Sequence, residues 1–227
     1  MTKSVAAFTQ TDTLPAHLQA GSGLGNENID NSAVTISRID LIQSLSPQLE
    51  ADNANFIDGA KVGDMFDTVT GELYQNVFLV NLHFATNFAV FKKRTLGGGF
   101  EGTFATEAEA LSHLQESKLP VEQYDISETH VHSCLLLDEK GVPKKPVNIY
   151  MSGSKIKVSR AWNTAILTKN QGADRFATVW VATSIKEKNK QNQPYQNFKV
   201  DFAGFCSEAL YDEAKDNYLA FKGQSAH

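Results

Sequence analysis

Short apolar runs separated by polar or glycine-rich breaks dominate the chain after its first third. These runs are rich in β-branched and aromatic residues, which is typical of strands that pack one face on a core. They predict strands at 77–82, at 88–91, from Gly99 onward, and at 131–137, 147–151, 176–184 and 198–205. The polar pair Thr86-Asn87 separates the first two strands, and the polar segment 186–193 joins the last two into a long β-hairpin with a basic tip.

Three other segments follow the helical period of 3.6 residues. Thr106 stands three residues before Glu109, a capping box that predicts a helix running to about Ser117. Segment 154–167 places its apolar residues on one face. Segment 207–221 begins with an N-cap serine, carries early acids and repeats apolar residues at helical spacing.

The order of these elements predicts a mostly β domain of the α+β class at 34–227, with one to three packed helices and a C-terminal helix at 207–221. Several short strands around a helix favour an OB-like Greek-key barrel, a fold whose partly open sheet binds oligonucleotides. Residues 1–33 are rich in Thr, Ser, Asn, Gly and Ala, which predicts a flexible or irregular N-terminal arm. Segment 36–49 is compatible with either a docking strand or a helical turn.

Basic residues concentrate in one part of an acidic chain. Residues 140–200 hold twelve Lys or Arg side chains against two acids, a net charge of +10, whereas the whole chain of 227 residues carries −5. Such asymmetry indicates a directed electrostatic surface for a polyanion. Aromatic residues lie between these charges, and flat rings beside cations suit unstacked bases and their phosphates. Single-stranded nucleic acid is therefore the leading hypothesis, and a solvated lysine face over core rings is the alternative.

The candidate nucleic-acid-binding residues are of two kinds. The cations that would neutralise phosphates are Lys92, Lys93, Arg94, Lys155, Lys157, Arg160, Arg175, Lys186, Lys188 and Lys190. The rings that would stack on bases are Trp162, Trp180, Tyr195 and Phe198. The two tryptophans also fit core positions, since large rings are usually mostly buried. Neither a catalytic residue nor a cofactor is predicted.

Two sets of residues offer alternative metal sites. His130, His132 and Cys134 alternate along a predicted strand and share one face, which is a reasonable ligand set for zinc, although a fourth ligand is not evident nearby. Asp64, Asp67 and Glu72 contain the carboxylates that a magnesium-dependent nuclease needs. Their spacing around Thr70-Gly71 is more typical of turn residues.

Several segments resemble a family of tailed-bacteriophage replication-region proteins. They are Gly23-Leu24-Gly25-Asn26-Glu27-Asn28, Ile36-Ser37-Arg38-Ile39, Ser44-Leu45-Ser46-Pro47, Gly63-Asp64, Thr70-Gly71-Glu72, Gly97-Gly98-Gly99-Phe100, Ser154-Lys155-Ile156-Lys157-Val158-Ser159-Arg160 and Trp162-Asn163. These proteins are similar to phage single-stranded DNA-binding proteins with an OB fold. The resemblance implies single-stranded DNA as the ligand, phage replication proteins as further partners, and the cytoplasm of an infected bacterium as the location.

The predicted function is sequence-independent binding of single-stranded DNA that protects or organises replication and recombination intermediates. The oligomeric state is left open. A metal-dependent nuclease or recombination enzyme is one alternative. A protein-interaction module, such as an inhibitor of a host factor, is another, with its contact surface in the acidic N-terminal third. Membrane insertion is not expected, because no apolar run approaches the ~20 residues that span a bilayer. Cys134 and Cys206 make no disulfide framework.

Overall fold

The computed structural model describes residue 24 and residues 35–224. The chain divides into two units, Met1–Thr35 and Ile36–His227, and the second contains every helix and strand described below. The N-terminal arm predicted at 1–33 lies outside the described residues, apart from residue 24.

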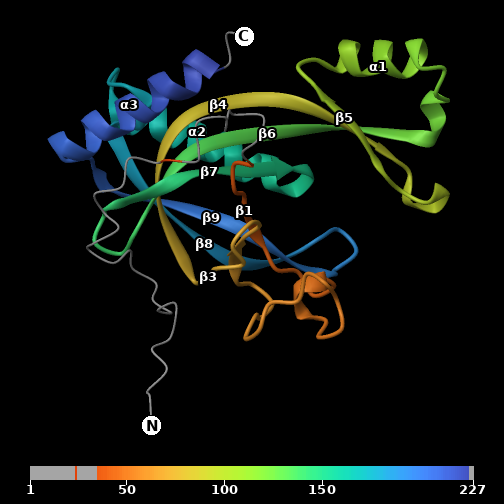
Figure 1. Ribbon diagram of the computed structural model, residues 1–227, viewed down its shortest axis with the longest axis horizontal. Coiled ribbons are helices and arrows are strands. Elements are labelled where there is room, and N and C mark those ends of the chain that lie inside the picture. The colour runs from red at the N-terminus through yellow and green to blue at the C-terminus, as the bar shows by residue number, and fades with distance from the viewer. Residues whose placement is uncertain (1–23, 25–34, 225–227) are drawn as a thin grey trace. The chain divides into compact units, whose positions relative to one another are not determined.

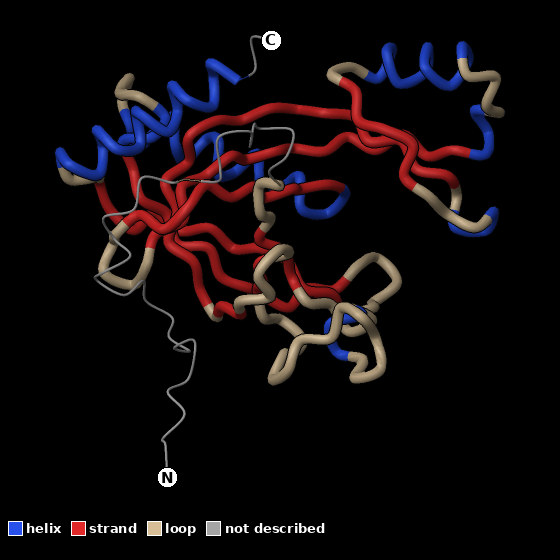
Figure 2. Tube along the Cα trace, viewed as in Figure 1, coloured by secondary structure: helices blue, strands red, loops and turns tan. Residues whose placement is uncertain are grey.

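Two antiparallel sheets form the greater part of the regular secondary structure in the second unit (Figures 1 and 2). The strands of the larger sheet are β4 (Asn76–Lys92), β5 (Phe100–Phe104), β6 (Tyr124–Leu137), β7 (Pro143–Ser152), β8 (Thr178–Lys188) and β9 (Pro194–Phe205). The smaller sheet contains β1 (Ile39–Leu41), β2 (Met65–Asp67) and β3 (Leu73–Tyr74). The larger sheet runs β7-β6-β4-β8-β9, with β5 paired to β4 beyond this path, and the smaller runs β1-β2-β3. The predicted α+β class with mostly β structure is therefore confirmed.

β4 is one long strand of 17 residues where the sequence pattern predicted two. Thr86 and Asn87, the predicted break, lie inside it and pair with β6. The prediction was wrong because a polar pair interrupts a strand only where the backbone leaves the ladder, and half-buried strand positions accept polar side chains. A register shift between Asn81 and His83 marks a β-bulge, a feature that bends a strand. β4 and β6 curve together toward β5 (Figure 1).

The larger sheet is open, since no pairing among the described residues joins its edge strands β7 and β9. The segment around β1 contacts both edges. Asn148 N of β7 donates a hydrogen bond to Ser37 O at 2.8 Å. The side-chain amide of Gln43 exchanges two hydrogen bonds with the main chain of Gln196 in β9, at 2.9 and 2.8 Å. One short segment thus covers both edges, and the OB-like barrel stays a prediction.

The helices are α1 (Glu107–Glu116), α2 (Ile156–Asn170) and α3 (Glu208–Gln224), close to the predicted bounds. Thr106 Oγ1 accepts a hydrogen bond from Glu109 N at 3.1 Å, so the predicted N-cap is confirmed. In the segment whose structure the sequence left open, β1 is followed by a short 3₁₀ turn at Pro47–Leu49.

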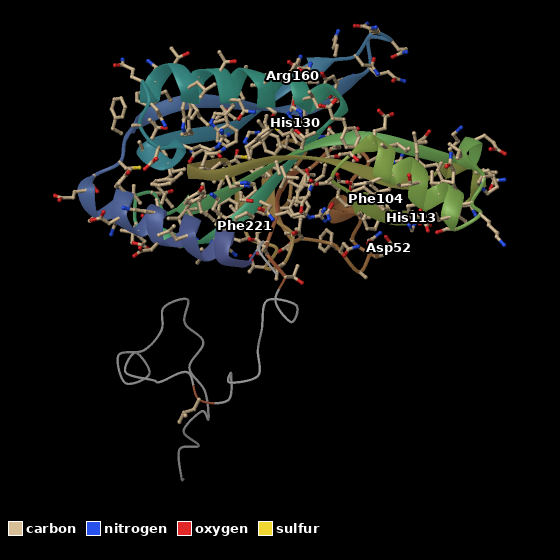
Figure 3. All side chains as sticks on the ribbon, turned by 90° about the horizontal axis from the view of Figure 1, so that it is seen from above. Asp52, Phe104, His113, His130, Arg160 and Phe221 are labelled. Atoms are coloured by element: carbon tan, nitrogen blue, oxygen red, sulfur yellow. The ribbon has the colours of Figure 1, made fainter. Side chains whose placement is uncertain are left out.

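The hydrophobic core has three parts. The main part lies among α2, β1, β2 and the larger sheet and includes Leu136, Trp162 and Trp180. A second part, under α3, includes Leu135 and Leu137, and a third lies under α1. Because successive side chains of β6 enter different parts, α2 and α3 cover opposite faces of the sheet (Figure 3).

Candidate nucleic-acid interface

A groove of about 560 Å³ opens where β1, β4, β5, β6 and β7 come together. We call it the aromatic groove, and its lining is Arg38, Asp40, Asn87, Ala89, Phe91, Phe100, Thr103, Thr129, Tyr150 and Ser152. Three of its rings are exposed: Phe91 by 43%, Phe100 by 63% and Tyr150 by 39%. Apolar surface gathered in one hollow in this way is typical of a ligand-binding groove.

Strand geometry places these rings on one side. Phe91 of β4 pairs with Phe100 of β5 beyond a bulge, and their ring centres are 5.5 Å apart with a tilt of 53°. On β7, Tyr150 alternates with Ile149 and Met151, which are buried in the main core. Since side chains alternate across a strand, the Tyr150 ring is directed away from that core.

A cation lies against the Tyr150 ring. The guanidinium of Arg38 is 5.5 Å from the ring centre, a cation–π distance. Arg38 and Asp40 flank Ile39, which is buried in the core, so the alternation of β1 turns both polar side chains into the aromatic groove. This edge of the groove therefore offers a positive charge beside a flat ring.

A second groove, of about 740 Å³, adjoins the first. We call it the hairpin groove, and its lining is Gln43, Ser152, Ser154, Lys155, Lys188, Asn189, Lys190, Gln193, Pro194, Tyr195 and Gln196. Ser152 lines both grooves, and Lys155 Nζ of the hairpin groove lies 3.1 Å from Asp40 Oδ1 of the aromatic groove. The two grooves therefore form one continuous track.

The hairpin groove gathers four of the residues predicted from the sequence, Lys155, Lys188, Lys190 and Tyr195. The Tyr195 ring is half-buried, and its hydroxyl donates to Glu187 Oε2 at 2.6 Å. Lys157 Nζ, the Tyr195 hydroxyl and Asn197 Nδ2 all donate to Glu187, and these bonds lower the pKa of that carboxyl to about 2. Tyr195 is thus anchored at its hydroxyl end beside the groove.

The other three predicted stacking rings lie in the main core. Trp162 is 2% exposed, Trp180 1% and Phe198 1%. Trp162 stacks on His132 with ring centres 4.4 Å apart, and Trp180 packs edge-on against Phe202. Neighbouring side chains cover all three rings, so they fill the core and do not line either groove.

In-chain ion pairs engage much of the basic stretch. The pairs are Lys144–Glu72, Lys145–Asp67, Lys155–Asp40, Lys157–Glu187, Arg160–Glu128 and Lys199–Asp201. Lys186, Lys188 and Lys190 at the hairpin tip are exposed and have no ion pair among the described residues. Three of the six cations of residues 140–200 that have no ion pair within the described part of the chain therefore lie together at the hairpin, and the other three, Lys140, Lys169 and Arg175, lie apart from one another along the chain.

The other predicted cations lie apart from the track. Lys92 and Lys93 are half-buried at the end of β4, where Lys93 Nζ donates to Glu122 O at 2.7 Å, and Arg94 is exposed. Arg160 lies on the outer side of α2 near His130 (Figure 3). None of the four lines the aromatic or the hairpin groove, and neither do the predicted cations Lys157, Arg175 and Lys186.

A buried hydrogen-bond chain holds α2 on the sheet. Arg175 Nε donates to Asn81 Oδ1 at 2.6 Å, so the Asn81 amide group faces His132 Nδ1 at 2.9 Å. His132 Nε2–H then donates to Ser159 Oγ at 2.7 Å, and the Ser159 hydroxyl donates to His130 Nδ1 at 2.7 Å. In this chain, each hydrogen bond determines which atom of the next residue donates and which accepts.

These contacts account for the residues considered for zinc. Every ring nitrogen of His130 and His132 is engaged, the last by Glu128 at 2.9 Å, and burial raises the pKa of the Cys134 thiol. Within the described part of the chain, no group of three or more His, Cys, Asp or Glu side chains is placed to hold a metal ion.

The three acids considered for magnesium have structural partners. Asp67 Oδ1 accepts hydrogen bonds from Val69 N and Thr70 N at 2.8 and 2.9 Å, and its Oδ2 pairs with Lys145. Asp64 accepts from Lys61 N and Gln75 Nε2, while Glu72 pairs with Lys144. They are turn and ion-pair residues, as their spacing indicated.

Sequence reasoning missed Arg38, Phe91, Phe100 and Tyr150 as groove residues. The available signal was the pairing of exposed rings across two strands, but it depends on a bulged register that the sequence does not specify. The Gly97-Gly98-Gly99 turn with Phe100 directly after it marked the place, since all three glycines have positive φ.

The fold and the track define a mostly antiparallel α+β protein with an exposed aromatic and basic surface. The chain belongs to the Pam3 phage gp34-like protein family, whose sequence model matches residues 7–227. It is therefore a member of a family of phage proteins. Neither the curated proteins nor the solved structures include a match to this chain.

No helix among the described residues is both long and apolar enough to cross a bilayer.

Proposed function

We propose that this protein binds single-stranded DNA without sequence preference along the track formed by the aromatic and hairpin grooves. The observation that carries the proposal is the placement of three exposed rings and a cation–π pair next to the lysine-rich hairpin tip. Aromatic faces accept any base, and lysines accept any phosphate, so the combination gives affinity with little sequence preference.

In this proposal, the aromatic groove stacks bases and the hairpin groove neutralises phosphates. In the aromatic groove, Phe91 with Phe100 provides one stacking surface, and Tyr150 beside Arg38 provides another. In the hairpin groove, Lys188 and Lys190 neutralise the backbone. A chain that stacks its bases in the first groove continues across Ser152 into the second, where its phosphates meet the lysines.

The fold supports this proposal in a general way. A curved antiparallel sheet whose two edges are bridged by one segment is compatible with an OB-like architecture, whose open face binds oligonucleotides. Membership of a phage family is compatible with the resemblance to phage single-stranded DNA-binding proteins, with a role in replication or recombination inside the infected bacterium, and with phage replication proteins as partners.

The test replaces two aromatic side chains of the aromatic groove by leucine, which removes the ring but keeps an apolar side chain. Phe100→Leu and Tyr150→Leu are each expected to weaken binding of a mixed-sequence single-stranded oligonucleotide by about tenfold, because stacking contributes roughly 1–3 kcal/mol per base. Fluorescence anisotropy measures the affinity, and chemical denaturation checks the fold. The matched control is Phe205→Leu, since Phe205 is 65% exposed on β9 and lines neither groove.

Two results would contradict the proposal. One is that wild-type protein fails to bind the oligonucleotide. The other is that both groove variants bind as tightly as the Phe205→Leu control. Divalent-ion-dependent loss of the oligonucleotide would instead favour the nuclease alternative.

A further inference from the structure

A third hollow, of about 420 Å³, lies where β4, the turn at Arg175–Ala177 and α3 meet. We call it the Arg175 pocket. Its lining includes two cations, Arg175 and Lys215, the imidazole of His83, and the rings of Phe84, Phe176 and Tyr218. It shares no lining residue with the aromatic or hairpin groove, so it is a separate site.

The Arg175 guanidinium is held by neutral groups. Its Nε donates to Asn81 Oδ1 at 2.6 Å, and its Nη2 donates to Asn163 Oδ1 at 2.5 Å. Within the described part of the chain, no carboxylate forms an ion pair with it, and its Nη1 has no hydrogen-bond partner. A guanidinium stays protonated in proteins, and a partly buried charge without a counter-ion is unfavourable.

One further cation, one imidazole and one carboxylate line the pocket with Arg175. Lys215 is exposed on α3. The pKa of His83 is lowered by burial and by the charges of Arg175 and Lys222, so the imidazole is neutral near pH 7 and can still donate a hydrogen bond. Asp174 also lines the pocket, and its carboxylate accepts a hydrogen bond from the Tyr211 hydroxyl at 2.5 Å.

The aromatic part of the lining suits a flat ring. The Arg175 guanidinium lies 5.5 Å from the centre of the Phe84 ring, and Phe176 and Tyr218 have ring centres 5.5 Å apart. Ligand pockets usually have volumes of about 300–1,000 Å³ and combine apolar walls with a few polar groups. The Arg175 pocket fits this description. Phe84 and Tyr218 are half-buried, whereas Phe176 is only 4% exposed and packs on Tyr218.

We propose that the Arg175 pocket binds a nucleoside carrying a terminal phosphate. Arg175 and Lys215 can both donate to the terminal oxygens of a phosphate monoester, which offers three such oxygens where a carboxylate offers two. The guanidinium still has Nη1 free to donate, although its Nε and Nη2 are anchored. The half-buried rings of Phe84 and Tyr218 receive the base. A free nucleotide and the phosphorylated end of a DNA strand present this same chemistry.

The test uses full-length protein and thymidine 5′-monophosphate, with thymidine and inorganic phosphate as partial ligands. Isothermal titration is expected to give saturable binding of the monophosphate and binding at least tenfold weaker for either part alone. Lys215→Met is expected to weaken binding of the monophosphate by about tenfold. The matched control Lys169→Met, an exposed lysine on α2 outside the pocket, is expected to leave it unchanged.

A second variant and two oligonucleotides complete the design. Arg175→Lys retains the positive charge but loses the planar set of N–H donors of the guanidinium. We expect this variant to fold and to bind the monophosphate more weakly than wild type. Tyr150→Leu, in the aromatic groove, is expected to have no effect on binding of the monophosphate, which separates this proposal from the proposed function.

Tighter binding of a 5′-phosphorylated oligonucleotide than of its dephosphorylated form would identify a strand end as the source of the phosphate, and equal binding would identify a free nucleotide. Equal affinity for thymidine and its monophosphate, or no saturable binding of the monophosphate, would overturn the proposal.

Discussion

At the residue scale, a chain of hydrogen bonds from Arg175 to Glu128 determines the orientation of Asn81 and the tautomer of His132. Asn81 is completely buried, and its orientation is set because Arg175 can only donate. That orientation makes His132 Nδ1 an acceptor and its Nε2 a donor. Protonating His132 would place a hydrogen on Nδ1, where Asn81 also presents one, so the fold requires the neutral imidazole.

This requirement predicts a pH dependence of stability. Burial, Arg175 and His130 lower the pKa of His132 from 6.5 to about 3 in the folded state. The unfolded state therefore binds a proton that the folded state does not, so the stabilisation is complete above pH 6.5 and is lost as the pH falls toward 3. We expect a loss of about 1.4 kcal/mol per pH unit within this window.

The measurement is urea denaturation at pH 7, 6 and 5 for wild type and His132→Gln. Glutamine keeps one acceptor and one donor but does not titrate, so its free energy of unfolding should fall less steeply with acidification. His83, whose pKa is also lowered, is present in both proteins and cancels in the comparison. If the free energy of unfolding fell equally with pH in both proteins, His132 would not contribute to the pH dependence of stability.

Tyr195 allows the ring to be separated from its hydroxyl. The hydroxyl bonds to Glu187, which also holds Lys157 and Asn197, whereas the ring lines the hairpin groove. We expect Tyr195→Ala to weaken single-stranded DNA binding by about tenfold and Tyr195→Phe to retain the affinity, because stacking needs the ring alone. Anisotropy titrations measure both. Equal affinities of the Ala and Phe variants would remove Tyr195 from the binding track.

Residue identity alone could not separate stacking rings from core rings. The charge pattern led to Trp162, Trp180 and Phe198, which lie within the basic stretch of the sequence but point into the main core. The sequence gives the period of a strand and not which of its faces is solvated. Tyr195 reached the groove because it follows Pro194 at the start of an edge strand, where one face remains open.

At the element scale, local signals predicted helices and hairpins well and strand length poorly. The capping box before α1, the apolar face of α2 and the polar tip between β8 and β9 each depend on neighbouring residues, and all three elements are present. The length of β4 depends instead on pairing with β6, 40 or more residues away in the chain for most partners. Without that pairing, the polar residues Thr86 and Asn87 inside β4 indicated a break between two strands.

The N-cap of α1 gives a test of one such local signal. Thr106→Ala removes the acceptor of the Glu109 N–H, and the free energy of unfolding should fall by about 1 kcal/mol. Thr106→Ser keeps the hydroxyl and is expected to remain within a few tenths of a kcal/mol of wild type. Chemical denaturation of the three proteins checks this. An equal loss for Ala and Ser would mean that the methyl group of the threonine matters and the cap does not.

At the scale of the whole molecule, charge counting identified the basic surface but overestimated its extent. Acids from outside the basic stretch neutralise several of its lysines, as Glu72, Asp67 and Asp40 do for Lys144, Lys145 and Lys155. These partners lie about 70–115 residues away along the chain, so no local window reveals them. The largest group of lysines that remains without an ion pair among the described residues is the smaller positive surface at the hairpin tip, formed by Lys186, Lys188 and Lys190.

That smaller surface predicts how binding responds to salt. Each phosphate neutralised on a single strand contributes about −0.7 to the slope of log affinity against log salt concentration. Replacing Lys186, Lys188 and Lys190 together by Ala should therefore make the slope shallower by ~2 and weaken binding to every sequence alike. The three side chains are exposed and have no ion pair among the described residues, so the free energy of unfolding should hardly change.

The control is Lys144→Ala, which removes a lysine that is paired with Glu72 and lies outside both grooves. This variant should leave the salt slope unaltered. A slope that is the same in the triple variant and the wild type would place the DNA away from the hairpin, and the stacking rings of the aromatic groove would then have to account for binding without it.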